Sequence, residues 1–275
     1  MTVVMKSGRG SLRSWAPAAE SVRQADLDEI NARFEGAHPR DVLEWGFASI
    51  DGLVIGTGFQ VGGLVNIHIA KQILDRVPVL FLQTGFHFPE TLSFRDQLVN
   101  DWDLELIETT PTFGPEMQAE VVGPELYKTD PDLCCHLNKV MPLETALSDR
   151  GGWATGVRRD QSPVRGKTQM FERQELTPEI VVWKLNPLAH WTRAQVDEYA
   201  ATYDIPRHPL YSQGYVSIGC APCTKPVNGE DERAGRWEGF GKTECGIHGV
   251  GGLEGSGHDE EIHAVGTNLT SGRPA

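Results

Sequence analysis

Residues 52–85 decide the fold, and they read GLVIGTGFQVGGLVNIHIAKQILDRVPVLFLQTG. The short apolar runs at 52–56 and 79–82 are bounded by glycine or proline, which predicts two buried strands. Between them, a glycine-rich turn at 57–63 leads into 64–77, where apolar residues recur at helical spacing until a proline ends the helix. A strand, a helix and a second strand in this order form the repeating unit of a parallel sheet.

The same alternation continues on both sides of this stretch. Further helices are predicted at 25–34, 89–102, 131–149 and 192–203, and further strands at 104–107, 153–157 and 180–183. Thr192 and Gln195 form a capping-box pattern at the start of the last helix. The sequence therefore predicts an α/β protein with a Rossmann-like, mostly parallel sheet flanked by helices on both faces.

The composition argues against several classes of protein. The chain of 275 residues carries a net charge of −13, which argues against a nucleic-acid binder. Its apolar runs are too short to cross a membrane, and no secretion signal is visible, so we expect a cytoplasmic protein. Basic residues nevertheless cluster at 139–167 and 233–242. Such clusters in an acidic protein mark either a pocket for a small anion or ordinary solvated surface.

The glycine-rich turn at 57–63 would place backbone N–H groups at the start of a helix, where they favour an anion. Leu64 stands where a Walker loop needs lysine, so a P-loop NTPase is not indicated, and the glycine spacing does not fit classical NAD binding. Taken alone, the turn is equally typical of a tight strand–helix connection. The neighbouring strand ends at Gln83, Thr84 and Gly85, at the edge where open parallel sheets bind ligands.

Four of the five cysteines form two pairs. Cys134 and Cys135 are adjacent, while Cys220 and Cys223 are three residues apart. A cytosolic chain does not use cysteines for structural disulfides, and thiolates are typical ligands of zinc and of iron–sulfur clusters. Zinc sites usually have two Cys-x-x-Cys pairs, whereas adjacent cysteines point in different directions and suit a larger cluster. The spacing favours a cluster, with zinc second and unligated core cysteines third.

The fifth cysteine, Cys245, lies in a segment with glycines on both sides, which indicates an accessible and mobile stretch. Lys242 would lower the pKa of the thiol, and Glu244 would raise it. His248 would either orient the thiol or contact an anionic substrate. The alternative is an idle surface thiol.

Together these motifs resemble the cluster-containing adenylyl-sulfate (APS) reductases of the wider PAPS/APS reductase family. The matching segments are Cys134-Cys135, Trp153–Ser162, Ser217–Thr224, Arg233-x-x-Arg236-Trp237 and Glu244–His248, with Thr84-Gly85 and Pro89–Thr91 on the substrate side. The resemblance covers about residues 50–250 and is specific, because independent motifs occur in the family's order.

The resemblance implies a role for each matching residue. Cys134, Cys135, Cys220 and Cys223 would hold a [4Fe–4S] cluster, and Cys245 would be the catalytic nucleophile. The implied substrate-binding residues are Lys139, between cluster and substrate, Thr84 and Gly85 at the strand end, and Arg158, Arg165, Arg233, Arg236 and His248 around the phosphate and sulfate.

The implied fold is adenine nucleotide alpha hydrolase-like, with a mobile C-terminal segment. We expect a flexible N-terminal arm at 1–20, a nucleotide- and cluster-binding reductase domain at 21–228, a mobile catalytic segment at 229–250 and a disordered tail at 251–275. The chain departs from the family at Thr57–Gly63, which replaces a polar run. It also departs at Gln83, in place of the usual Asp, and at Phe86-His87-Phe88, in place of Arg-x-His. These departures bear on the nucleotide contacts more than on the reaction.

The implied reaction is the reduction of APS to sulfite and AMP in sulfate assimilation, through an S-sulfocysteine on Cys245. The other four cysteines are assigned as ligands, so the thiol donor would be external, and this family uses thioredoxin or glutaredoxin. The alternatives are a PAPS or dual APS/PAPS reductase, an adenylating enzyme on the same fold, and a non-catalytic metal-binding redox sensor. No nucleic-acid or membrane partner is expected, and a homo-oligomer is one option for the assembly.

Overall fold

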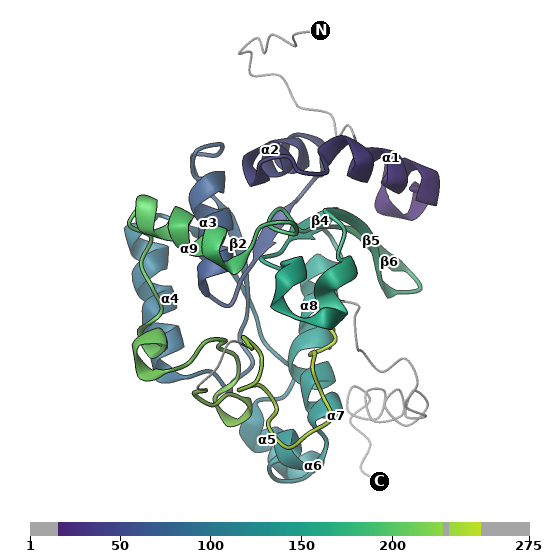
Figure 1. Ribbon diagram of the computed structural model, residues 1–275. Helices are drawn as coiled ribbons and strands as arrows, with labels where there is room; N and C mark the ends of the chain where they lie inside the picture. The colour runs from purple at the N-terminus through teal and green to yellow at the C-terminus, as the bar shows by residue number, and fades with distance from the viewer. Residues whose placement is uncertain (1–15, 228–230, 249–275) are drawn as a thin grey trace, which may run out of the picture.

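A six-stranded sheet forms the centre of the part of the chain that the structure describes (Figure 1). The computed structural model describes residues 16–227 and 231–248. The strands are β1 (Val54–Gly56), β2 (Pro78–Leu82), β3 (Glu105–Thr109), β4 (Gly152–Ala154), β5 (Phe171–Thr177) and β6 (Ile180–Leu185). Their order is β3-β2-β1-β4-β6-β5, and all neighbours are parallel except β5, which is antiparallel to β6. The mostly parallel sheet predicted from the sequence is confirmed.

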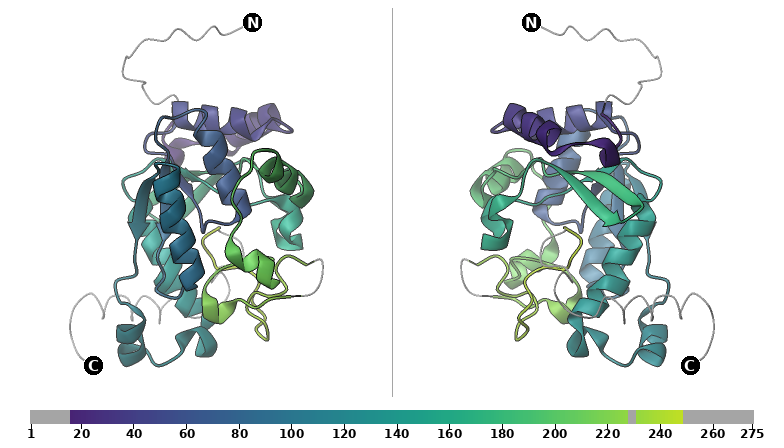
Figure 2. Two further views of the ribbon diagram at one scale, coloured as in Figure 1. Left: turned by 90° about the vertical axis from the view of Figure 1, so that its left-hand side faces the viewer. Right: turned by 90° about the vertical axis from the view of Figure 1, so that its right-hand side faces the viewer.

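Helices cover both faces of this sheet (Figure 2). One face carries α1 (Gln24–Phe34), α2 (Pro39–Ser49), α3 (Val61–Ala70), α4 (Pro89–Asp101) and α9 (Arg193–Thr202), which contribute to the larger hydrophobic core. The other face carries α8 (Met141–Leu147). Because successive strand residues point to opposite faces, Ile55 and Val79 belong to the larger core, while Val54 and Leu80 pack with the α8 residue Leu143.

Three short helices lie at the opposite end of the molecule from α1 and α2 (Figure 1). They are α5 (Pro115–Val121), α6 (Leu126–Thr129) and α7 (Pro131–Cys135). The helix predicted at 131–149 is divided into α7, a π-helical turn at His136–Val140, and α8. π-Helical turns are rare and occur frequently at functional sites, and this one follows the cysteine pair directly.

Helix α3 differs from its prediction at both ends. It begins at Val61 rather than at residue 64, because glycines 62 and 63 lie inside the helix and allow its first turn to approach the preceding loop. It ends at Ala70 rather than at residue 77, where the N–H groups of Ile73 and Leu74 both donate to the Ala70 carbonyl. Ile73 and Leu74 still pack against the core, so their spacing extended the predicted helix beyond its true end.

Four of the described helices and strands escaped the sequence prediction. They are helix α2, the short helices α5 and α6, and strand β5, whose residues pair with β6 across a tight turn. Strand β5 has only two buried residues, Phe171 and Gln174, and carries several charged residues, so it lacks the continuous apolar run that revealed the parallel strands.

The structure describes only part of the predicted arm and tail regions of the chain. The tail at 251–275 and most of the arm at 1–20 lie outside the described residues, although a short 3₁₀ turn at Ala19–Ser21 buries Ala19. None of the helices in the described ranges combines the length and the apolar character that crossing a membrane requires.

Candidate active site

The carboxyl ends of β1 and β4 lie side by side where the strand order reverses, and a cavity opens there. The lining includes most of the residues implicated by the motifs: Thr84, Lys139, Arg158, Arg165, Arg233, Arg236, His248, Cys220 and Cys245. Gly85 is not part of the lining. Its φ is +78°, and a Cβ there would lie 2.7 Å from Pro115 Cγ, so this position needs glycine for its backbone conformation.

The loop after β1 forms one wall of the cavity. Thr57 Oγ1 accepts a hydrogen bond of 2.9 Å from the backbone N–H of Phe59, which has a positive φ of 56° and is fully buried. A Cβ on Gly63 would lie 2.1 Å from Thr57 Oγ1, so glycine is required there. The side chain of Gln60 donates to the Ile218 carbonyl at 2.7 Å and accepts from the Ile218 N–H at 2.9 Å. Gln60 therefore joins the loop after β1 to the segment that carries Cys220.

One cysteine pair lies on α7, and the other lies on the segment around the 3₁₀ turn Ala221–Cys223. Burial raises the pKa of Cys134 to about 12, and the charges of the other three cysteines contribute to this rise. The two pairs therefore influence one another electrostatically. Thr84 Oγ1 lies 3.4 Å from Cys220 Sγ, and Asn138 Nδ2 lies 3.7 Å from Cys134 Sγ. Polar groups therefore accompany the sulfur atoms at both pairs.

These cysteines can be tested as ligands by their chemistry. All are free thiols, and three of the four are buried. Soft thiolates with hydrogen-bond donors close to sulfur suit an iron–sulfur cluster. Among the described residues, no group of three or more His, Cys, Asp or Glu side chains has the spacing of a single-ion site. The four thiols therefore have the chemistry of cluster ligands. Their positions among the described residues do not by themselves form a site for a single metal ion.

Lys139 lies in the π-helical turn that follows Cys134 and Cys135, and it lines the cavity together with Cys220 and Cys245. Its burial would lower its pKa, but the thiols of Cys220, Cys135 and Cys245 together raise the pKa above its ordinary value. The ammonium group therefore stays charged although the side chain is only 9% exposed.

Trp237 gathers the cations of the site around its buried indole ring. The charged groups of Lys139, Arg233, Arg236 and Lys242 lie 5.8, 5.6, 4.5 and 5.7 Å from the ring centroid. An aromatic face attracts cations without neutralising them. Arg233 and Lys242 also pair with carboxylates, whereas Lys139 and Arg236 form no ion pair among the described residues and keep their positive charge available for an anion. Trp237 stands in the left-handed region with a φ of 49°, which is uncommon for a bulky residue.

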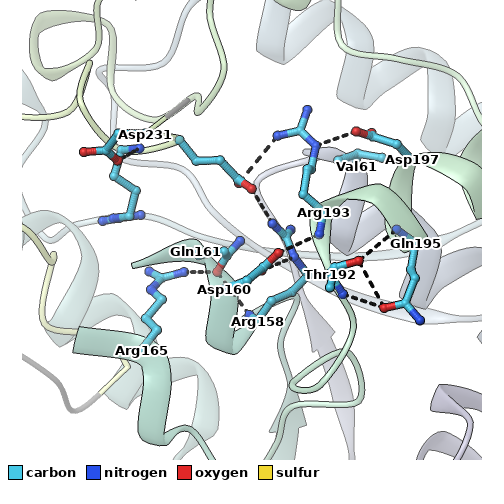
Figure 3. Close-up of polar contacts among 12 residues, drawn as sticks. Val61, Arg158, Asp160, Gln161, Arg165, Thr192, Arg193, Gln195, Asp197 and Asp231 are labelled. Carbon is cyan, nitrogen blue, oxygen red and sulfur yellow. Dashed lines mark hydrogen bonds and ion pairs between the residues drawn. The ribbon is translucent and has the colours of Figure 1, made fainter. Parts of the chain in front are cut away.

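Two predicted substrate-binding arginines of the cavity lining are held by carboxylates. Arg158 donates to Asp160 at 2.9 Å and also to Glu232, which in turn lies 3.5 Å from Arg193 (Figure 3). Arg165 forms a two-pronged pair with Glu244, with both N···O distances at 2.7 Å. Paired guanidinium groups of this kind are fixed in orientation.

Cys245 is half-buried in the same cavity. Burial would raise the pKa of its thiol, but Lys139 and a hydrogen bond from the Ile247 backbone lower it below the ordinary value, against the opposing charge of Glu244. Glu244 raises the pKa of the Cys245 thiol, as expected from the sequence. The thiolate is therefore favoured at this position.

The cation that lowers the Cys245 pKa most is Lys139 rather than Lys242. Lys242 forms an ion pair with Asp132 of α7 instead, which fastens the C-terminal segment to the helix that carries the cysteine pair. Lys242 was expected to lower the pKa because it is close to Cys245 in sequence. The pKa of Cys245 depends instead on Lys139, which is distant in sequence but close in the fold.

His248 lies against the sheet at the end of the described segment. Its ring stacks on that of Trp153, with centroids 5.6 Å apart and planes at 2°. Burial, followed by the charges of Arg165, Lys184 and Arg233, lowers the pKa of His248 well below its ordinary value. A neutral imidazole would meet a substrate through hydrogen bonds rather than charge, and its Nδ1 has no hydrogen-bond partner among the described residues.

Solved structures share this architecture. The crystal structure of phosphoadenylyl-sulfate (PAPS) reductase from Candida auris, a phosphate complex, matches with a TM-score of 0.65 and 27% identity, covering 75% of this chain and 98% of that chain. An FMN adenylyltransferase from Candida glabrata matches in fold, with a TM-score of 0.54, 14% identity, and coverage of 76% of this chain and 70% of that chain. The fold is thus of the adenine nucleotide alpha hydrolase-like class.

Residues 53–226 match the phosphoadenosine phosphosulfate reductase domain, and the chain belongs to this family. The relatives include adenosine 5′-phosphosulfate reductase of Salinibacter ruber, 40% identical over 225 residues, with 81% of this chain and 88% of that protein covered. The enzyme of the same name from Streptomyces coelicolor is 41% identical over 227 residues, with 82% and 94% covered. The family resemblance read from the motifs is confirmed.

Several residues of the site were not found from the sequence. Gln60 acts on Ile218 across 158 positions of sequence, so no local pattern could reveal it. Gln174 and Lys184 lie on β5 and β6 and contact the C-terminal segment, which equally depends on tertiary structure. Trp237 stands inside the second basic motif, and its place beside two arginines was the available signal.

Proposed function

We propose that the protein reduces adenylyl sulfate (APS) to sulfite and AMP in sulfate assimilation, using thiols as the source of electrons. The observation that carries this proposal is that Cys245 lines the same cavity as the glycine-rich loop and the cationic side chains. The full-length relatives named adenosine 5′-phosphosulfate reductase support the choice of substrate.

The chain's own groups suggest how the substrate is held. The loop at 57–63 and the start of α3 would receive the nucleotide, because backbone N–H groups and the helix dipole favour an anion there. Arg158, Arg165, Arg233 and Arg236, with Lys139, would surround the phosphate and sulfate, and neutral His248 would donate or accept a hydrogen bond.

The reaction follows from a thiolate and an activated sulfate. The Cys245 thiolate attacks the sulfur of the sulfuryl group, a sulfur–sulfur bond forms, and the sulfur–oxygen bond to AMP breaks with the electron pair leaving on the phosphate. Cationic side chains stabilise the negative charge that develops on this leaving group. The product on the protein is an S-sulfocysteine.

Sulfite is then released by a dithiol. A thiolate of the donor attacks the Cys245 sulfur, the bond to the sulfonate breaks, and sulfite leaves with the electron pair. The second thiol of the donor attacks the mixed disulfide and restores the Cys245 thiol, so the donor is oxidised and the sulfate sulfur is reduced. Because the other four cysteines are assigned as ligands, the donor is external, as thioredoxin or glutaredoxin would be. Such a thiol cycle belongs in the cytoplasm, where thiols are kept reduced.

Cys134, Cys135, Cys220 and Cys223 would hold a [4Fe–4S] cluster. When bound, the cluster would supply electrostatic stabilisation near Lys139 rather than electrons. A change of cluster oxidation state during turnover would contradict this role.

The test measures sulfite released by anaerobically purified protein with thioredoxin and either APS or PAPS. Sulfite chiefly from APS is expected, and Cys245→Ser should abolish it. Sulfite chiefly from PAPS would replace the proposed substrate with the 3′-phosphorylated nucleotide. Sulfite from neither, with the metal content intact, would overturn the enzymatic proposal and favour a metal-binding redox sensor.

A further inference from the structure

The proposed chemistry places two demands on Cys245. Its sulfur must lie inside the cavity for attack on the substrate, and it must be reachable by an external thiol afterwards. A segment that meets both demands needs contacts that fix it in the closed position and that can be broken. Such contacts lie on the sheet, next to the end of the described segment.

Three side chains from three neighbouring strands contact the residues that follow Cys245. Gln174 Nε2 of β5 donates to the Ile247 carbonyl at 2.9 Å, and Lys184 Nζ of β6 donates to the His248 carbonyl at 2.9 Å. Trp153 of β4 supplies the ring on which His248 stacks. We propose that Trp153, Gln174 and Lys184 form a latch that positions Cys245 for the first half of the reaction.

The latch is preorganised by contacts within the sheet. Trp153, Gln174 and Lys184 are 3%, 8% and 2% exposed. The indole N–H of Trp153 donates to Gln174 Oε1 at 2.9 Å, which leaves the amide N–H₂ of Gln174 facing Ile247. Lys184 is held by Glu172 at 2.6 Å. Both strand pairings, β4 with β6 and β6 with β5, support these side chains on a rigid surface.

The latch differs in kind from the other anchor of the segment. Glu244 is anchored on Arg165 and Arg233, and these same arginines are the groups expected to bind the anionic substrate. An incoming anion therefore competes with the Glu244 anchor. Gln174 and Lys184 are not expected to bind the substrate. The latch contacts can therefore remain in place while the arginines bind the substrate. This inference rests on the proposed function of Cys245.

The latch residues bind backbone carbonyl groups, so they act through the position of the segment rather than on the reacting atoms. Each hydrogen bond is worth a modest amount, which suits a segment that must also open. We therefore expect loss of one contact to slow the closed-state reaction about 5- to 30-fold rather than to abolish it.

The experiment uses the full-length holoenzyme and two variants. Gln174→Glu keeps the size of the side chain and the acceptor for Trp153, but it places an anionic oxygen against the Ile247 carbonyl. Lys184→Met removes the donor to His248 and keeps most of the apolar stem. Arg173→Gln is the matched control, because Arg173 is the neighbour of Gln174 on β5, is exposed and pairs with Glu175.

Three measurements separate positioning from general damage. The first is the rate at which APS forms S-sulfocysteine without reductant, followed by mass spectrometry. The second is sulfite release by thioredoxin from protein that already carries the S-sulfonate. The third is the rate of Cys245 alkylation by iodoacetamide without substrate, located by peptide mapping.

Both variants should form S-sulfocysteine about 5- to 30-fold more slowly, release sulfite at the normal rate and undergo faster alkylation, while the control behaves like wild type. Faster alkylation would reflect access, since both substitutions make the site more negative and would by charge alone disfavour the thiolate. Unchanged alkylation and unchanged S-sulfonation in both variants would overturn the latch. If wild type forms no S-sulfocysteine, the proposed function fails, and alkylation still decides whether the latch holds the segment.

Discussion

Glu244 pairs with two arginines of the cavity lining and directly precedes Cys245, so we expect it to affect both substrate binding and the position of the proposed nucleophile. It is 1% exposed, pairs with Arg165 through both oxygens and lies 3.2 Å from Arg233. Removing one partner of a buried ion pair is strongly destabilising, because the remaining charge is left uncompensated. If Glu244 loses its charge, the positive charges of Arg165 and Arg233 are left uncompensated. These are two of the arginines that we expect to bind the substrate.

Glu244→Gln should therefore lower kcat at least tenfold, because the segment loses its anchor, while the affinity for AMP stays equal or rises. Sulfite assays and calorimetric titration with AMP measure the two effects. Glu238→Gln is the control, since Glu238 is an exposed carboxylate of the same segment that pairs with Lys225. Weaker AMP binding in the Glu244 variant would show that this carboxylate supports the nucleotide site instead of competing for its arginines.

His208, which is not part of the cavity lining, should make the stability of the fold depend on pH. It is 1% exposed, its Nδ1 accepts from the Leu210 N–H at 3.2 Å, and its Nε2 lies 2.9 Å from Thr91 Oγ1. Burial lowers the pKa of His208 to about 4, and the Leu210 contact leaves no room for a proton on Nδ1. The neutral ring is thus the form that the fold accepts.

Because the folded pKa lies below the unfolded value of 6.5, the contribution of His208 is complete above pH 6.5 and is lost as pH falls towards 4. Stability should fall by up to about 1.4 kcal/mol per pH unit from this group within that window. Chemical denaturation at several pH values tests this, and His208→Gln should flatten the slope. A histidine NMR titration with a midpoint near 6.5 would contradict the argument.

The residues of the site were predictable where chemistry alone marks them, and their partners were not. Cysteines and arginine clusters stand out in any sequence, and the family resemblance then singled out Cys245 and Arg165 as candidates. That Glu244 neutralises Arg165 depends on a contact across 79 positions. Sequence spacing carries no information about such a pairing.

At the scale of the elements, the contact between α3 and the loop after β4 shapes the part of the cavity where we propose that the nucleotide binds. A Cβ on Gly156 would lie 2.9 Å from the backbone nitrogen of Gly63 and 3.0 Å from the carbonyl carbon of Gly62. Both atoms belong to backbone and cannot rotate away. The helix therefore approaches the loop as closely as glycine allows.

Gly156→Ala should push the first turn of α3 outward, destabilise the protein by about 1–3 kcal/mol and raise KM for APS more than it lowers kcat. Denaturant unfolding and steady-state sulfite release measure these effects. Gly114→Ala is the control, because a Cβ there meets nothing within 4 Å and the position lies at the start of α5, outside the cavity lining. Equal losses in both variants would mean that the glycine contact has no special role.

The elements that the sequence revealed are those with a strong one-dimensional signal. Strands β1 and β2 are short apolar runs buried on both faces, and α9 begins with the predicted Thr192 cap, whose side chain accepts from the Gln195 N–H. Strand β5 is an antiparallel edge strand with one half-exposed face, so its polar residues hid it. The latch lies partly on this strand, which is why it could not be inferred from the sequence.

At the scale of the whole molecule, the site forms where distant parts of the chain converge. The parallel sheet supplies the glycine-rich loop after β1, α7 supplies one cysteine pair, and residues from 216–220 and 232–248 line the cavity. Contacts that join these parts include Gln60 with Ile218, His87 with Cys220 in an isolated bridge, and Lys242 with Asp132. The segment around Cys220 has little regular structure of its own, so its position depends on such long-range ties.

Removal of iron should therefore loosen one part of the molecule selectively. If a cluster joins Cys134 and Cys135 to Cys220 and Cys223, chelation after mild oxidation breaks the strongest tie between α7 and the segment 216–223, because metal binding contributes directly to the stability of the fold around it. The thermal midpoint should fall by about 5–15 °C. Amide hydrogen exchange should rise in 216–223 and in the π-helical turn, while α2 and α9 keep their protection.

The appropriate control is Cys245→Ser, which should abolish sulfite release yet retain iron, the thermal midpoint and the exchange pattern. This variant separates loss of the nucleophile from loss of the frame that positions it. Exchange in 216–223 that does not change after iron loss would mean that Gln60 and the buried side chains of this region hold the segment by themselves. In that case the four cysteines would contribute to the electrostatics of the site and not to its architecture.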